Sequence, residues 1–281
     1  MADTIVTSVP ERLLAVYAVV TSDPPDGDLL PSSGGLAADV VPRDMAPLPA
    51  SALVRAMGAD SATLEAYEAG SHAVLVRAVG TATFPPAHEF AAYKAAQTIS
   101  DLSGGVLVDT LIPRLVTRPR DVGDDFRLAD WMVLPHSLHG SLLWFTSKGL
   151  TRFGLSELQS HGIPQPLANA WGAVLTGIAQ VLLREHARAL AEDPSAALRE
   201  VPATQEVSLR DIAAAYSDHA RFGKDAGLDT AAPFRLELDP ATEESADSFL
   251  SVLPPDDFGG TPDQWAGEVV RTLFTGHDAA G

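Results

Sequence analysis

The chain has 281 residues, of which 46% are hydrophobic, and a formal net charge of -18 at pH 7. An apolar fraction of this size excludes wholesale disorder, and the negative field disfavours roles on nucleic acid or anionic membranes because it repels phosphate. The sequence contains no cysteine, which excludes disulfides, thiolate nucleophiles and cysteine-ligated metal sites.

The negative charge is concentrated towards the end of the sequence. Residues 207–281 contain 14 acidic and 5 basic residues. A solvated acidic face explains this bias, and a docking face for a basic protein partner is the alternative. No stretch has the ligand spacing of a calcium loop, so we expect no metal and no cofactor.

The N-terminal part of the sequence predicts a strand, a long excursion and a short helix. Residues 14–21 (LAVYAVVT) are rich in β-branched and aromatic residues, which favours a buried strand. The preceding charges and the shortness of this apolar run favour neither a signal peptide nor a membrane span, and cytoplasm is the expected address. Residues 22–49 are rich in Pro, Gly and Asp and predict a long loop, and residues 50–57 predict a short helix.

A strand, a helix and a second strand follow. The run HAVLVRAVGT at residues 72–81 predicts a strand, and Pro85 and Pro86 precede a helix at residues 87–102. A glycine turn then leads to a strand at residues 106–112. This order is typical of a layered fold of helices on a sheet.

In the middle of the chain we expect a hairpin and one long interior helix. A charged connection at residues 113–125 leads to predicted strands at residues 128–134 and 141–146, joined by a loop at residues 136–140. Residues 166–191 predict the helix, which has no charged residue before Arg184. Its apolar window approaches spanning length, but polar residues interrupt it, so a buried core helix is the better interpretation.

The C-terminal part predicts shorter elements. Residues 196–207 are irregular or extended, and the remaining elements are a helix at 209–216, strands at 234–238 and 249–253, and a helix at 263–274. We therefore expect an α/β or α+β fold with a mixed central sheet packed by helices. One large domain is compatible with the length, or residues 1–190 form an α/β core on which an acidic part, residues 191–281, packs.

Two histidines in the expected loop are the first candidate for a catalytic site. His136 and His139 can converge in a turn, with Asp130 nearby in sequence. Two imidazoles and a carboxylate can perform acid–base chemistry near neutral pH. The alternative is a pair of solvated loop histidines.

Four further residues are candidates for substrate binding. Arg114 and Arg127 flank a stretch rich in arginine that can clamp a carboxylate or phosphate, although interspersed aspartates make a surface ion-pair network the alternative. Trp144 can line a pocket or simply pack in the core. Lys148 follows a core strand, but Ser147 stands where a phosphate-binding loop requires glycine, so Lys148 can equally be an exposed turn residue.

The stretch around Lys148 carries a resemblance to a known family. The residues Thr146-Ser147-Lys148-Gly149-Leu150, then Phe153-Gly154, then Glu157-Leu158, resemble the Thr-x-x-Gly-Leu…Phe-Gly-x-x-Glu-Leu segment of a bacterial family of unknown function. The likeness covers roughly residues 141–183. It implies that Gly149 and Gly154 adopt positive φ and that Glu157 caps the polar turn.

Two classes of function remain open at this point. The first is a cofactor-independent enzyme (cyclase, isomerase, lyase or hydrolase) that uses His136 or His139 with Asp130, while an arginine stabilises developing negative charge. The second is a non-catalytic binding or immunity-type module whose acidic face meets a basic partner. No Gly-x-Ser-x-Gly elbow and no dinucleotide fingerprint is present to favour a particular enzyme.

Overall fold

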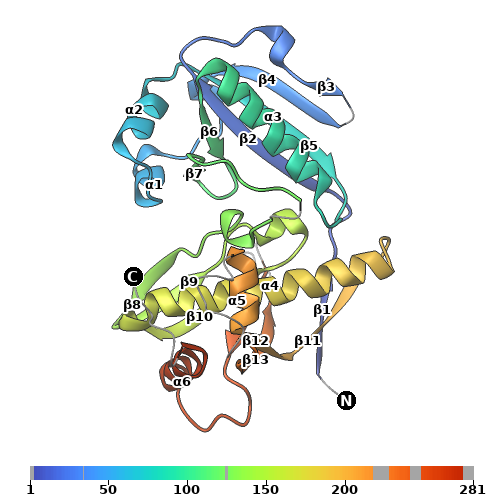
Figure 1. Ribbon diagram of the computed structural model, residues 1–281, viewed down its shortest axis with the longest axis vertical. Helices are drawn as coiled ribbons and strands as arrows, with labels where there is room; N and C mark the ends of the chain where they lie inside the picture. Colours follow the sequence, from blue (N-terminus) through green and yellow to red (C-terminus); the bar gives the residue numbers. More distant parts are fainter. Residues whose placement is uncertain (1–2, 34, 124–125, 218–227, 241–247, 275–281) are drawn as a thin grey trace. The chain divides into compact units, whose positions relative to one another are not determined.

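The computed structural model describes residues 3–33, 35–123, 126–217, 228–240 and 248–274, which belong to two compact units (Figure 1). Residues 10–122 form one of them, here called the inserted unit, and residues 1–9 with 123–281 form the other, here called the host unit. The division considered after residue 190 falls inside the host unit. The chain is an α+β protein, as expected.

The inserted unit is a six-stranded antiparallel sheet with three α-helices. The strands have the order β3-β4-β5-β2-β6-β7. The bounds in this unit are β2 Leu13–Thr21, η1 Gly27–Leu29, β3 Ser32–Ser33, β4 Leu36–Pro42, η2 Arg43–Met45, α1 Ser51–Ala56, α2 Ser61–Ala69, β5 His72–Gly80, α3 Ala87–Ser103, β6 Val106–Asp109 and β7 Arg114–Leu115.

The central strand β2 is buried on both faces, which explains its nearly continuous apolar sequence. Ala18 and Val20 pack with Val54 of α1 and Leu64 of α2. Tyr17 points the other way and contacts Tyr93 of α3, with 5.7 Å between the ring centroids. Because β5 and β6 both pair antiparallel with β2, the predicted strand–helix–strand is a split β-α-β unit with β2 between its two strands (Figure 1).

The host unit contains a six-stranded mixed sheet and a separate two-stranded sheet. The large sheet has the order β12-β13-β14-β10-β9-β8, in which only the β10–β14 pair is parallel, and β1 pairs with β11 in the small one. The bounds in this unit are β1 Thr4–Ser8, η3 Leu128–Asp130, β8 His136–His139, β9 Leu142–Thr146, η4 Leu150–Phe153, β10 Glu157–Pro164, η5 Gln165–Leu167, α4 Ala168–Glu192, β11 Leu198–Pro202, β12 Thr204–Ser208, α5 Leu209–Tyr216, β13 Ala231–Asp239, β14 Phe249–Leu253 and α6 Pro262–Phe274.

The long helix α4 is the interior helix that the sequence predicts. Trp171 is fully buried, donates through Nε1 to Ser160 Oγ of β10 at 3.2 Å, and contacts Trp265 of α6 with 5.1 Å between ring centroids. By length and composition the helical stretch Gln165–Glu192 could cross a membrane, but 56% of its most apolar window is buried in the structure. This burial is as expected for the core helix of a globular domain.

Most predicted elements are confirmed, four stretches differ, and the sequence did not predict β1 or α2. The expected loop at 22–49 contains β4, which pairs with β5, and the expected strand at 128–134 is instead η3 followed by irregular chain. The expected loop at 136–140 is mostly the edge strand β8. The polar turn before α4 leads into strand β10, which the sequence did not predict.

Candidate functional site

The structure does not bring the two predicted catalytic histidines together. His136 and His139 both lie on the exposed edge strand β8. His136 contacts Phe145 with 4.9 Å between ring centroids, whereas His139 contacts Trp144 with 5.5 Å between them. Phe145 and Trp144 are consecutive in β9 and therefore point to opposite faces of the sheet. The rings of His136 and His139 therefore do not converge as they could in a loop.

The other predicted site residues are also dispersed. Asp130 lies in η3, where its Oδ2 is 3.2 Å from Nε of Arg127 in an ion pair. Arg114 belongs to the inserted unit, in β7. Lys148 is exposed, and its backbone N–H and C=O both bond to Val133. These residues show no common site within the host unit.

Trp144, the remaining predicted binding residue, lies between two histidine rings. Its indole stacks on His161 of β10, with 4.9 Å between ring centroids and 16° between ring planes, while His139 meets it edge-on. Burial, and secondly the nearby His139, lower the pKa of His161. His161 was missed because it lies in a strand that the sequence did not predict.

The turn that carries the family resemblance is built around a buried carboxylate. Glu157 accepts hydrogen bonds from Gly149 N at 2.7 Å and Thr151 N at 3.3 Å through Oε1, and from Ser147 Oγ at 2.6 Å through Oε2. Gly149 has φ 123° and Gly154 has φ 80°, so the implied positive φ and the capping role of Glu157 are confirmed. These residues serve to shape the turn.

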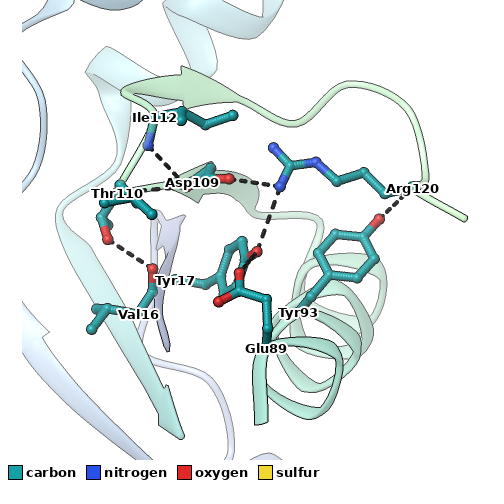
Figure 2. A network of polar contacts seen from close by, with 9 residues as sticks. Val16, Tyr17, Glu89, Tyr93, Asp109, Thr110, Ile112 and Arg120 are labelled. Carbon is teal, nitrogen blue, oxygen red and sulfur yellow. Dashed lines mark hydrogen bonds and ion pairs between the residues drawn. The ribbon is translucent and has the colours of Figure 1, made fainter. Parts of the chain in front are cut away.

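A buried polar network lies in the inserted unit (Figure 2). Arg120 Nη1 donates to Asp109 Oδ2 at 2.6 Å, and the backbone N–H of Arg120 donates to the Tyr93 hydroxyl at 2.6 Å. Tyr17 donates to Glu89 Oε1 at 2.5 Å. All five residues are at most 5% exposed, and each of them makes at least one hydrogen bond within the network. We interpret the network as structural, because it links the chain segment around Arg120 to β2, α3 and β6.

The inserted unit also has a cavity of about 520 Å³ beside Arg43. The Arg43 guanidinium lies 4.4 Å from the centre of the Tyr67 ring and donates to the Tyr67 carbonyl. The Tyr67 hydroxyl in turn donates to the Pro49 carbonyl at 2.5 Å. Because the Arg43 guanidinium donates to the Tyr67 carbonyl and packs on the Tyr67 ring, this cavity does not present an arginine without a partner.

A smaller cavity, in the host unit, contains the side chain of Arg199, two of whose nitrogen atoms have no partner among the described residues. Its volume is about 240 Å³, and it is lined by residues of β1, the second half of α4 and β11, namely Thr4, Leu182, Glu185, Arg188, Ala189, Arg199, Glu200, Val201 and Pro202. Alternation along β11 places Arg199 and Val201 on the buried face, whereas Leu198, Glu200 and Pro202 are exposed. The Arg199 side chain is therefore held where the sheet meets α4.

Arg199 is a buried cation for which the described part of the chain supplies no counterion. The residue is 9% exposed, and its Nε and Nη1 atoms have no hydrogen-bond partner among the described residues. Glu185, the acidic residue of α4 in the cavity wall, is bonded by Arg188 instead. Burial lowers the pKa of Arg199 to about 10, so the guanidinium remains charged at neutral pH. An unpaired buried charge is costly, so this site favours an incoming anion.

A buried histidine of α4 interacts electrostatically with Arg199. His186 of α4 is 1% exposed, and its Nε2 lies 2.8 Å from the Phe153 carbonyl oxygen. That carbonyl can only accept, so Nε2 carries the proton. Burial, followed by the charge of Arg199, lowers the pKa of His186 to about 4. The imidazole is therefore neutral at pH 7, and Arg199 is the charged member of the two.

No protein-family model, curated protein or solved structure matches this chain. The interpretation of the site therefore depends on its own geometry. Sequence reasoning missed Arg199 because residues 196–207 were expected to be irregular or extended, with no face assigned. The available signal was the segment LREVP, in which an arginine shares its strand face with a valine.

Proposed function

We propose that the protein is a binding protein for a small anionic molecule, which it recognises at Arg199 in the cavity between α4 and β11. The observation that carries this proposal is the buried guanidinium, two of whose nitrogens have no partner among the described residues. A ligand carboxylate or phosphate would supply the missing charge and hydrogen-bond acceptors. The cavity volume of about 240 Å³ is below the roughly 300–1,000 Å³ typical of sites for drug-sized ligands, which favours a small molecule.

A binding role has better support than the acid–base enzyme. The catalytic hypothesis placed His136 or His139 beside Asp130, but the two rings contact residues on opposite faces of the sheet and Asp130 pairs with Arg127. The cytoplasmic location and the basic protein partner of the acidic C-terminal part stay predictions.

Equilibrium unfolding in urea with added anions tests the proposal. We expect sodium acetate, phosphate or sulfate, compared with sodium chloride at equal ionic strength, to raise the free energy of unfolding of the wild-type protein. A ligand at a hundred times its Kd adds about 2.7 kcal/mol. The variant Arg199→Met should lose this anion-dependent increase, whereas Arg188→Met, which removes an exposed arginine from the same cavity wall, should retain most of it.

The same variants test whether Arg199 merely supports the fold. Without added anion, Arg199→Met should be as stable as the wild type or more stable by about 1–3 kcal/mol, because methionine fills similar space without a buried charge. An Arg199→Met variant that is less stable than the wild type, together with a wild type that no anion stabilises beyond chloride, would contradict the proposal.

A further inference from the structure

Part of the wall of the Arg199 cavity is aliphatic, and the rest is formed by charged residues of α4 and β11 and by Thr4. Leu182 and Val201 are at most 3% exposed, and Ala189 and Pro202 complete the aliphatic part of the lining. A ligand that only neutralised the guanidinium would leave the accessible part of this lining, on Ala189 and Pro202, against water. A ligand with a hydrocarbon body would cover it, which is favourable in proportion to the apolar area removed from water.

The charges around the cavity limit the ligand to a single negative charge. Arg199 is the buried cation, and the exposed Arg188 is already paired with Glu185. Glu185 and Glu200 both lie in the cavity wall. A phosphate dianion would carry one charge more than Arg199 neutralises and would face these two carboxylates, which is unfavourable in partly buried surroundings.

We infer that the ligand is a monocarboxylate with a short aliphatic body, an inference that rests on the proposed anion-binding function. Its carboxylate bonds to the guanidinium of Arg199, whose donors suit the two oxygens of a planar carboxylate. Its hydrocarbon body lies against Leu182, Ala189 and Val201. Glu185 and Glu200 select against anions of higher charge.

Isothermal titration calorimetry with acetate, butyrate and hexanoate tests this assignment on the full-length protein. Each methylene buried in the cavity should tighten binding by about fourfold, the factor that corresponds to about 0.8 kcal/mol per methylene. Inorganic phosphate and sulfate should bind more weakly than butyrate at the same pH and ionic strength.

Two variants separate the contribution of the apolar wall to ligand affinity from the contribution of the charged wall residues. Val201→Thr keeps the side-chain shape but adds a hydroxyl to the apolar wall, so it should flatten the dependence on chain length while leaving acetate binding nearly unchanged. Glu185→Gln removes a negative charge from the wall and should bring phosphate closer to butyrate in affinity. Circular dichroism at the titration temperature establishes that each variant is folded.

The outcomes distinguish this inference from the proposed function. Phosphate that binds more tightly than butyrate, or affinities that do not depend on chain length, would overturn the monocarboxylate assignment and leave anion binding intact. A wild-type protein that binds none of these anions would overturn both. Hexanoate binding that survives Arg199→Met undiminished would also overturn both, because Arg199 would then not hold the carboxylate.

Discussion

The imidazole of His186 links the stability of the host unit to pH. The side chain is 1% exposed and donates from Nε2 to the Phe153 carbonyl, and its pKa in the folded protein is about 4. In an unfolded chain the pKa of histidine is about 6.5, so the unfolded state takes up the proton first as the pH falls. The stability that this residue contributes is therefore complete above about pH 6.5 and is lost as the pH falls through about 4.

We expect the wild-type protein to lose roughly 3 kcal/mol more stability between pH 7 and pH 4 than His186→Gln, whose amide cannot take up the proton. Urea denaturation at several pH values in this range measures the difference. An identical pH dependence for the two proteins would show that the burial of His186 does not govern acid sensitivity.

The buried network of the inserted unit shows how a single cation can hold several elements. Arg120 lies beyond the last strand of that unit, and it reaches Asp109 of β6 through its side chain and Tyr93 of α3 through its backbone N–H (Figure 2). Its charge is matched by a carboxylate, unlike the charge of Arg199. This contrast explains why we assign a structural role to Arg120 and a binding role to Arg199.

At the scale of whole elements, the packing of α4 against α5 depends on a glycine. A Cβ atom added at Gly177 would lie 2.5 Å from Cγ1 of Ile212 and 2.9 Å from Cγ2 of Val207. In contrast, a Cβ atom at Gly267 of α6 would meet nothing within 4 Å. The two positions thus form a matched pair in two helices of the same unit.

We expect Gly177→Ala to lower the free energy of unfolding by about 1–3 kcal/mol, because the helices must move apart. Gly267→Ala should raise it by up to about 1 kcal/mol through helix propensity alone. Thermal and urea denaturation of the two variants measure both changes in the free energy of unfolding. Similar stabilisation by both substitutions would contradict the close approach of α4 and α5.

The elements that the sequence predicts correctly are those whose local pattern agrees with their burial. The strands β2 and β5 and the helices α3 and α4 have apolar runs or helical spacing that need no distant partner to be recognised. Strand β8 was missed because all four of its residues are exposed on a sheet edge and show no apolar alternation. Strand β10 was missed because Gln159, Ser160 and His161 are polar and its register with β9 is irregular.

The candidate site at Arg199 could not be predicted from local sequence patterns, for a further reason. Arg199 lies in strand β11, where side chains alternate between the two faces. The cavity beside it is also lined by Thr4 of β1 and by the second half of α4. Which groups face a buried arginine depends on these distant contacts. The sequence could indicate an extended segment at this position, but it could not show that the residues described in the structure leave Arg199 without a counterion.

At the scale of the whole molecule, the first strand, β1, is separated in sequence from the rest of its own unit. β1 pairs antiparallel with β11, with Thr7 opposite Arg199, and therefore belongs to the host unit although the inserted unit follows it directly in sequence. Deletion of residues 1–9 would remove both the pairing partner of β11 and the Thr4 side of the cavity. The effect should be confined to the host unit, since the inserted unit has its own core.

We expect this deletion to increase backbone hydrogen exchange in β11 and to weaken anion binding, while β2 and β5 of the inserted unit keep their protection. Exchange followed by mass spectrometry, with the intact chain as reference, measures both regions at once. An equal loss of protection in β2 and β5 would mean that the two units unfold together.

The pairing of β1 with β11 also sets an order of events on the ribosome. Ser8 and its partner Leu198 are 190 residues apart, so at about 5–20 residues per second the strand waits roughly 10–40 s for its partner to be synthesised. The whole inserted unit emerges during this interval. A nascent chain arrested shortly before residue 198 should therefore display a folded middle portion with β1 still unpaired, and β1 would be open to capture by a chaperone until translation resumes.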